Sequence, residues 1–217
     1  MEEMIKLISS FGLSVVISGF VLFFAVKFVN ELFDDFKRKR AEKSKADLAE
    51  ARNQVSTTIM TILERTLLRA RCDRAYVFEF HNGTASIGGL PFMKMTNTYE
   101  AHSEHTVSEM AVRENMPMQM YATYLHSIAN NDYVIFDTRS RTNAASNFEY
   151  ETLLARKVVV CACAAIKDIH MKPVGYLGID FCHDHLIDDA AVETGARLVQ
   201  GAAKEIGALL TVHKKSA

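Results

Sequence analysis

The chain has 217 residues, with 25 Lys and Arg against 26 Asp and Glu, and its formal net charge is −1 at pH 7. This balance excludes the basic footprint of a nucleic-acid-binding protein, so we expect no nucleic acid among its partners. The length suits one domain with an extension. Four cysteines without a paired spacing indicate a reducing compartment.

Residues 7–26 contain no charged side chain. A helix of about 20 residues is about 30 Å long, which is the thickness of the hydrocarbon layer of a bilayer. The acidic start of the chain and the length of the run do not fit a cleaved signal peptide. A buried helix that is apolar on every face is unusual in so small a domain. The sequence therefore predicts a single-pass protein of the inner (cytoplasmic) membrane, with lipid as a partner and residues 1–29 as N-terminus and span.

Basic residues follow this apolar run and are scarce before it. Those that follow are Lys27, Lys37, Arg38, Lys39, Arg40, Lys43 and Lys45, whereas only Lys6 precedes the run. The positive-inside rule then places the C-terminal part of the chain in the cytoplasm.

Three serines recur at every fourth position of the apolar run. Ser10, Ser14 and Ser18 form one stripe on a helix, and Gly19 lies beside its end. Small residues with this spacing let two helices approach closely, although a serine can also bond to the carbonyl group four residues earlier. We expect a homo-oligomer that forms through the membrane helix and the stalk that follows it.

Residues 30–71 contain neither Gly nor Pro, a composition that favours one long helix. Residues 30–54 are mostly charged and are expected to form a solvated stalk. From residue 55 the large apolar residues are three or four positions apart; they are Val55, Ile59, Ile62, Leu63 and Leu67. This spacing predicts an amphipathic face that packs on a partner helix or on the domain that follows.

Residues 55–217 read as one domain. Alternation of aromatic and β-branched residues predicts a strand at residues 74–81. Further strands are predicted at residues 92–99 and 133–136, and two apolar strands at residues 158–166 and 174–181. Helical spacing predicts helices from Pro117 to His126, from Phe148 to Lys157 and from Ala190 to Val212. This order predicts an α+β fold in which helices pack on one face of an antiparallel sheet.

A cluster of polar and small residues lies where the first strand is expected to end. It comprises Glu79, His81, Asn82, Gly83, Gly88 and Gly89. Polar side chains beside a loop of small residues can line a pocket for a small ligand. Asn-Gly is equally typical of a plain turn, so both interpretations stay open.

Two cysteines lie two positions apart on a predicted strand, and a Cys-His-x-His segment follows the neighbouring strand. Cys161 and Cys163 then share a face, and Cys182, His183 and His185 are the further candidates for a zinc or iron site. The familiar CxxC and HxxxH spacings are lacking, and cysteine is commonly a buried core residue. We therefore expect core packing, with no metal and no other cofactor.

The sequence carries no motif of a familiar enzyme class. It lacks the G-x-S-x-G elbow, the P-loop, the H-E-x-x-H motif and the Rossmann glycines. We therefore expect a protein that is not an enzyme.

The order of elements over residues 55–213, together with the Gly-Tyr-Leu-Gly-Ile-Asp-Phe segment at Gly175–Phe181, resembles the GAF/PAS family of sensor domains. The resemblance implies that both terminal helices lie on the same side of the sheet.

The whole chain also resembles the lysis holins of T-even bacteriophages: a short N-terminus, one membrane helix, an amphipathic stalk and a compact domain closed by a helix. The matching segments are residues 67–80, Tyr99-Glu100, the strand carrying Cys163, Gly175–Phe181 and the helix from Ile187. The resemblance implies a periplasmic domain that binds an antiholin and times lysis. That family's disulfide has no counterpart here, because no cysteine follows Asp188.

These observations predict a holin-like protein in which a sensor domain, regulated by a protein partner or a small ligand, controls a self-associating membrane helix. One alternative is a membrane-tethered cytoplasmic GAF-like sensor or binding module. Another is an accessory viral or bacterial membrane protein that binds only protein. The holin interpretation leads because no kinase, cyclase or DNA-binding segment follows the predicted domain.

Overall fold

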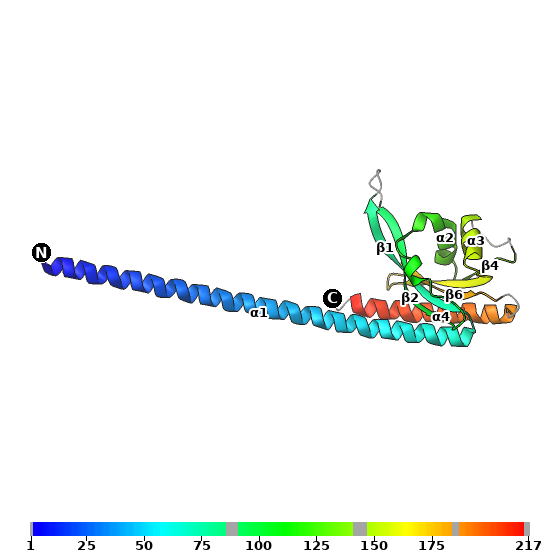
Figure 1. Ribbon diagram of the computed structural model, residues 1–217, viewed down its shortest axis with the longest axis horizontal. Helices are drawn as coiled ribbons and strands as arrows, with labels where there is room; N and C mark the ends of the chain where they lie inside the picture. The colour runs from blue at the N-terminus through cyan, green and yellow to red at the C-terminus, as the bar shows by residue number, and fades with distance from the viewer. Residues whose placement is uncertain (1, 86–90, 141–146, 184–186, 215–217) are drawn as a thin grey trace. The chain divides into compact units, whose positions relative to one another are not determined.

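The computed structural model of the protein (Figure 1) describes residues 2–85, 91–140, 147–183 and 187–214. The chain divides into two compact units, residues 1–52 and 53–217. Helix α1 (Glu2–Ala70) makes up the described part of the first unit and continues into the second. The helix predicted for residues 30–71 is thus present, as expected from its lack of Gly and Pro.

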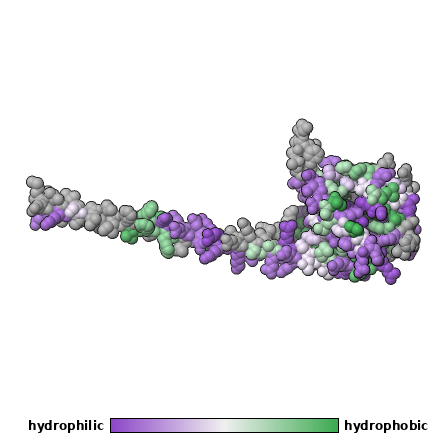
Figure 2. All heavy atoms as spheres, viewed as in Figure 1, coloured by the Kyte–Doolittle hydropathy of each residue, from purple (hydrophilic) through white to green (hydrophobic). Residues whose placement is uncertain are grey.

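The structure contradicts the predicted membrane span. A helix needs about 20 consecutive apolar residues to cross a bilayer, and within the described residues no helix is long and apolar enough to do so. The exposed apolar side chains described between Val21 and Val29 are interrupted by Lys27, and charged residues follow them (Figure 2). The membrane-spanning helix at residues 7–26 and the inner-membrane localisation were therefore wrong predictions.

In the described part of the second unit, six strands form one antiparallel sheet in the order β3-β2-β1-β6-β5-β4. The strands are β1 (Arg74–Ala85), β2 (Pro91–His102), β3 (Met116–Pro117), β4 (Val134–Asp137), β5 (Val160–Lys167) and β6 (Pro173–Phe181). All five predicted strands are present, because short runs rich in apolar, aromatic and β-branched residues favour strands that are buried in a sheet.

Strand β1 is longer than its sequence indicated. Asn82 pairs with Met93 and Ala85 with Pro91, with an irregularity of register between Asn82 and Ala85. The Asn-Gly dipeptide therefore lies inside the strand, and the prediction that the strand ends there was wrong. Pairing with β2 outweighs the local turn preference of these residues.

Helices cover both faces of the sheet (Figure 1). Residues 53–70 of α1 and helix α4 (Asp189–Lys214) pack on one face. The other face carries α2 (Ala122–Asn130), α3 (Asn147–Ala155) and the short 3-10 helices η1 (Met110–Val112) and η2 (Met118–Tyr121). We call the latter the α2/α3 face. The terminal helices share a side as expected, but the prediction that helices pack on one face only was wrong, because the central strands are buried on both sides.

Each face has its own hydrophobic core. Val77 and Leu177 point toward the terminal helices, where Ile59 and Leu63 of α1 are fully buried against them. The amphipathic face predicted from residue 55 thus packs on the domain itself. The α2/α3 face is aromatic instead; its buried rings belong to Tyr76, Phe78, Tyr124, Phe136 and Tyr176.

Helix α4 lies very close to strand β5. A Cβ atom added at Gly207 would stand 2.5 Å from the main-chain oxygen of Lys167, whereas one added at Gly201 of the same helix would meet nothing within 4 Å. Gly207 is therefore required by packing and Gly201 is not.

We expect Gly207→Ala to lower the free energy of unfolding by about 1–3 kcal/mol through overpacking. The matched control Gly201→Ala should raise it by up to about 1 kcal/mol, because alanine is the better helix former. Urea denaturation followed by circular dichroism measures both changes. Equal effects of the two substitutions would show that α4 does not dock closely at Lys167.

Candidate functional site

A buried carboxylate lies at the centre of the α2/α3 face. Asp180 of β6 is fully buried and pairs across the sheet with Arg74 of β1. Its carboxylate accepts hydrogen bonds from the Tyr76 hydroxyl (2.9 Å), from Arg74 (3.2 Å) and from Arg156 (2.6 Å), which follows α3. The charge of Asp180 is thus paired and hydrogen-bonded, as a buried charge must be.

A second carboxylate joins the same group of arginines. Glu109, which precedes η1, lies 2.7 Å from Nη1 of Arg74 and 2.5 Å from Nε of Arg156. Nη1 of Arg113 is 3.5 Å from Glu109. We call Arg74, Glu109, Arg113, Arg156 and Asp180 the arginine cluster. Three guanidinium groups are ion-paired there with two carboxylates.

Arg113 is the least well paired member of the cluster. It is 8% exposed, and its guanidinium carbon lies 4.8 Å from the ring centre of Tyr76 and 4.3 Å from that of Phe78. Its buried Nη1 atom makes no hydrogen bond, and neither does Nε of Arg74. A cation over aromatic rings is stabilised by their electrostatic field, but that contact does not replace a hydrogen-bond acceptor.

Arg113 and Arg156 of the cluster stay charged. Burial alone would lower the pKa of Arg156, but Asp180, Tyr76 and Glu109 more than offset this effect and raise it. The pKa of Arg113 is also raised, because Tyr176, Tyr76 and Asp180 together outweigh burial and the neighbouring Arg156. The arrangement can therefore recognise a negative group, since guanidinium forks match carboxylates and phosphates.

The aromatic rings beside the cluster form a packed layer. Phe78 and Tyr176 stack with ring centres 4.9 Å apart, and Tyr124 and Phe136 stack at 4.3 Å. Burial raises the pKa of Tyr76, Tyr124 and Tyr176 well above 10, so their hydroxyls remain protonated at neutral pH.

The two strand cysteines belong to this aromatic core. Cys161 and Cys163 are fully buried, and the Tyr124 hydroxyl lies 2.8 Å from the sulfur of Cys163 and 3.7 Å from that of Cys161.

The remaining candidates for a metal site contact another residue. The main-chain N–H of Cys182 donates to Asp73 (2.6 Å), and Nδ1 of His183 lies 3.0 Å from the same carboxylate. His185 falls outside the described residues. Over the part of the chain that the structure describes, no three His, Cys, Asp or Glu side chains are grouped so that they could hold a metal ion.

The candidate pocket at the end of β1 is only partly described. Nε2 of His81 lies 2.8 Å from the Thr96 hydroxyl, which also accepts the main-chain N–H of Asn115. Glu79 is half-buried, Asn82 is exposed and Gly83 continues the strand. Gly88 and Gly89 lie outside the described residues. A ligand pocket at these residues stays a prediction.

The predicted helix-association stripe also stays a prediction. Ser18 is exposed on α1. The side chains of Ser10 and Ser14, and the surroundings of Gly19, lie outside what the structure describes.

Sequence reasoning missed the arginine cluster. One signal was available, because Asp180 interrupts an apolar strand and Arg74 shares a face of its strand with Tyr76 and Phe78. Glu109, Arg113 and Arg156 carried no such signal, since they lie in or beside irregular segments.

Comparison with solved structures shows which known fold the domain resembles. No model of a known protein family and no curated protein matches the sequence. The phycoerythrobilin-bound GAF domain of a cyanobacterial phytochrome matches with a TM-score of 0.59 at 13% identity, over 79% of this chain and 92% of that chain. The domain has a GAF-like fold.

Two other solved structures agree. A far-red cyanobacteriochrome photoreceptor matches with a TM-score of 0.56 at 12% identity, over 81% of this chain and 96% of that one. The blue-light-absorbing form of the Thermosynechococcus elongatus PixJ GAF domain matches with a TM-score of 0.55 at 10% identity, over 76% of this chain and 92% of that one. The predicted resemblance to GAF domains is confirmed at the level of the fold, whereas the resemblance to lysis holins gains no support.

We expect Tyr76→Phe to lower the free energy of unfolding of the GAF-like domain by about 1.5–3 kcal/mol, because it removes a hydrogen bond to the buried Asp180 carboxylate. Tyr176→Phe is the matched control, since the Tyr176 hydroxyl has no hydrogen bond among the described residues. Chemical denaturation of both variants tests this. A similar loss in both would contradict the role assigned to the Asp180 bond.

Burial, with Asp180 and Asp73 nearby, raises the pKa of the Cys182 thiol to about 12. Because only the thiolate reacts, we expect iodoacetamide labelling of native Cys182 to rise about tenfold per pH unit between about pH 7 and 9.5, without levelling off. In the denatured chain the rate should level off near the ordinary pKa of about 8.5. Peptide mass spectrometry follows the site, and a plateau near pH 9 in the native protein would refute this environment.

Proposed function

We propose that residues 53–217 form a ligand-binding sensor module, and that its ligand is a small anion held at the arginine cluster. The GAF-like fold supports a binding module. This proposal replaces the holin interpretation and keeps the sensor alternative without its membrane tether.

The observation that carries the proposal is the incomplete pairing of Arg113. Its Nη1 atom is buried without a hydrogen bond, in a cluster whose three guanidiniums meet only two carboxylates. A buried polar group without a partner costs about 1–3 kcal/mol, and more when it is charged. An anion beside Arg113 would remove that cost and neutralise the excess charge.

The aromatic layer favours a ligand smaller than a bilin. Two of the similar structures are named as bilin-bound GAF domains, and a bilin is a long conjugated molecule. Here Tyr76, Phe78 and Tyr176 are fully buried against one another on the α2/α3 face, so the rings themselves occupy much of the space a large ligand would need.

A change at the cluster has a short path to α1. The helix ends at Ala70, and Arg71 follows in a left-handed conformation (φ 51°). The main-chain N–H of Asp73 then donates to the main-chain oxygen of Asp180 (2.8 Å). An anion that shifts Asp180 or Arg74 would therefore displace the residues that directly follow α1, which is how a sensor could report binding.

Isothermal titration of the purified chain with inorganic phosphate and with succinate tests the proposal. We expect saturable binding of at least one of them at low ionic strength. Arg113→Lys should weaken it about tenfold, because lysine keeps the charge but loses the planar fork.

Arg38→Lys is the matched control, because Arg38 is exposed in the first unit and, within the described residues, its ion pair is with Asp35, three positions before it. The Arg38→Lys variant should bind phosphate or succinate with the same affinity as the natural chain. Identical titrations for the natural chain and Arg113→Lys would contradict an anion site at the cluster.

A further inference from the structure

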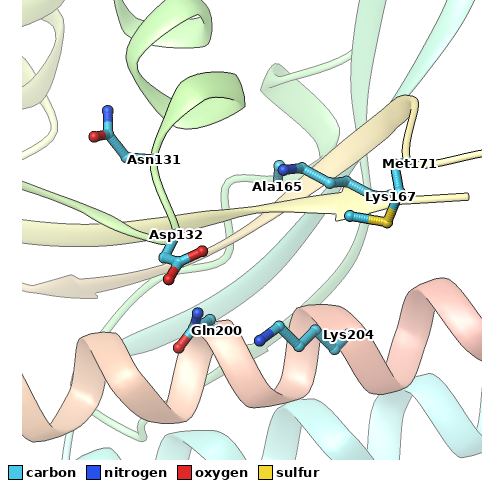
Figure 3. A pocket seen from close by; sticks show the side chains of 7 residues that line it. All are labelled: Asn131, Asp132, Ala165, Lys167, Met171, Gln200 and Lys204. Atoms are coloured by element: carbon cyan, nitrogen blue, oxygen red, sulfur yellow. The ribbon is translucent and has the colours of Figure 1, made fainter.

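A hollow of the GAF-like domain lies beside the terminal helix α4, and none of the residues of the arginine cluster lines it. It has a volume of about 330 Å³ and lies between α4, β5 and the segment that joins α2 to β4 (Figure 3). The residues that line it are Asn131, Asp132, Ala165, Lys167, Met171, Gln200 and Lys204.

Four polar side chains point into this hollow from three different parts of the chain. In Figure 3 the ammonium groups of Lys167 and Lys204, the amide of Gln200 and the carboxylate of Asp132 are directed toward the same space. None of these four side chains has a hydrogen bond or an ion pair among the described residues. Asn131 is different, because its amide donates to the main-chain oxygen of Ser127 (2.7 Å).

The charges of the hollow define the ligand that it would complement. Two ammonium groups and one carboxylate leave a net charge of +1, with positive and negative groups in separate places. A purely anionic ligand would meet Asp132 unfavourably, because like charges in one site repel. A molecule with two negative groups and one positive group can pair with all three side chains and neutralise the excess.

The volume of the hollow limits the size of the ligand. A volume of about 330 Å³ is at the small end of the range for ligand pockets, so the ligand has few atoms beyond its charged groups. Met171 and Ala165 supply an apolar wall against which a short aliphatic chain can lie.

We propose that this hollow is a binding site for a small acidic amino acid, whose two carboxylates pair with Lys167 and Lys204 and whose ammonium group pairs with Asp132. Gln200 donates a further hydrogen bond to a carboxylate. The site is separate from the arginine cluster and goes beyond the function proposed above. A ligand there bridges α4 to β5 and to the segment before β4, beside the close contact of Gly207 with Lys167, and thereby holds the terminal helix on the sheet.

Isothermal titration of the full chain with L-glutamate tests the site, with glutarate as the probe that lacks only the amino group. We expect saturable binding of L-glutamate at concentrations up to about 10 mM. Lys204→Gln should weaken this binding about fivefold, as the loss of one partly exposed ion pair predicts. Lys94→Gln is the matched control, since Lys94 lies on β2, three strands away from β5 in the sheet, and does not line the hollow.

Asp132→Asn separates the role of the amino group from that of the carboxylates. We expect this substitution to weaken the binding of L-glutamate about fivefold. The binding of glutarate should stay unchanged or become tighter, because the repulsion between its carboxylates and Asp132 is removed. Asp132 and Lys204 are exposed and Lys94 is half-buried, and circular dichroism tests whether each variant is folded. The proposal is overturned if L-glutamate does not bind, if Lys204→Gln and Lys94→Gln affect it equally, or if Asp132→Asn changes L-glutamate and glutarate alike.

Discussion

The buried carboxylate of Asp180 is the constraint on which the α2/α3 side of the domain depends. A charge that is fully removed from water must be paired and hydrogen-bonded, and here Arg74, Tyr76 and Arg156 supply those contacts. Because Arg156 follows α3 and Glu109 precedes η1, satisfying this one charge also ties the segments that cover the face to the two central strands.

Different interactions stabilise the packing on the two faces of the sheet. On the side of α1 and α4 the contacts are aliphatic, and small residues such as Gly207 set how close the helix lies. The α2/α3 face combines stacked aromatic rings with ion pairs whose charges do not balance. An aliphatic interface is satisfied once it is packed, whereas an unbalanced charged cluster is completed by a further charge. That difference is why the anion site proposed at the arginine cluster is on the α2/α3 face, whereas the hollow beside α4 is lined by polar side chains outside the aliphatic core.

Much of the domain could be predicted from local patterns. Alternation in residues 74–81 and the apolar run at residues 174–181 predicted two central strands. The spacing from Val55 to Leu67 predicted a helix with one buried face, because such patterns record which side chains leave water. Predictions that relied on local composition alone failed. The Asn-Gly dipeptide lies inside β1, where pairing with β2 determines the conformation. The apolar run at residues 7–26 predicted a membrane span, but within the described residues no helix is long and apolar enough to be one.

The sequence by itself determined the order and type of most elements and the amphipathic end of α1, since these follow from periodicities of a few residues. Its resemblance to GAF/PAS domains indicated the class of the fold. Only the tertiary structure decided that helices cover both faces, that Arg74, Glu109, Arg113, Arg156 and Asp180 meet, and that Lys167 and Lys204 face Asp132 across one hollow. The physical reason is distance along the chain. Charged groups from a strand, a loop and a helix end come together only when the sheet and its covering helices are assembled, and no short-range pattern records that meeting.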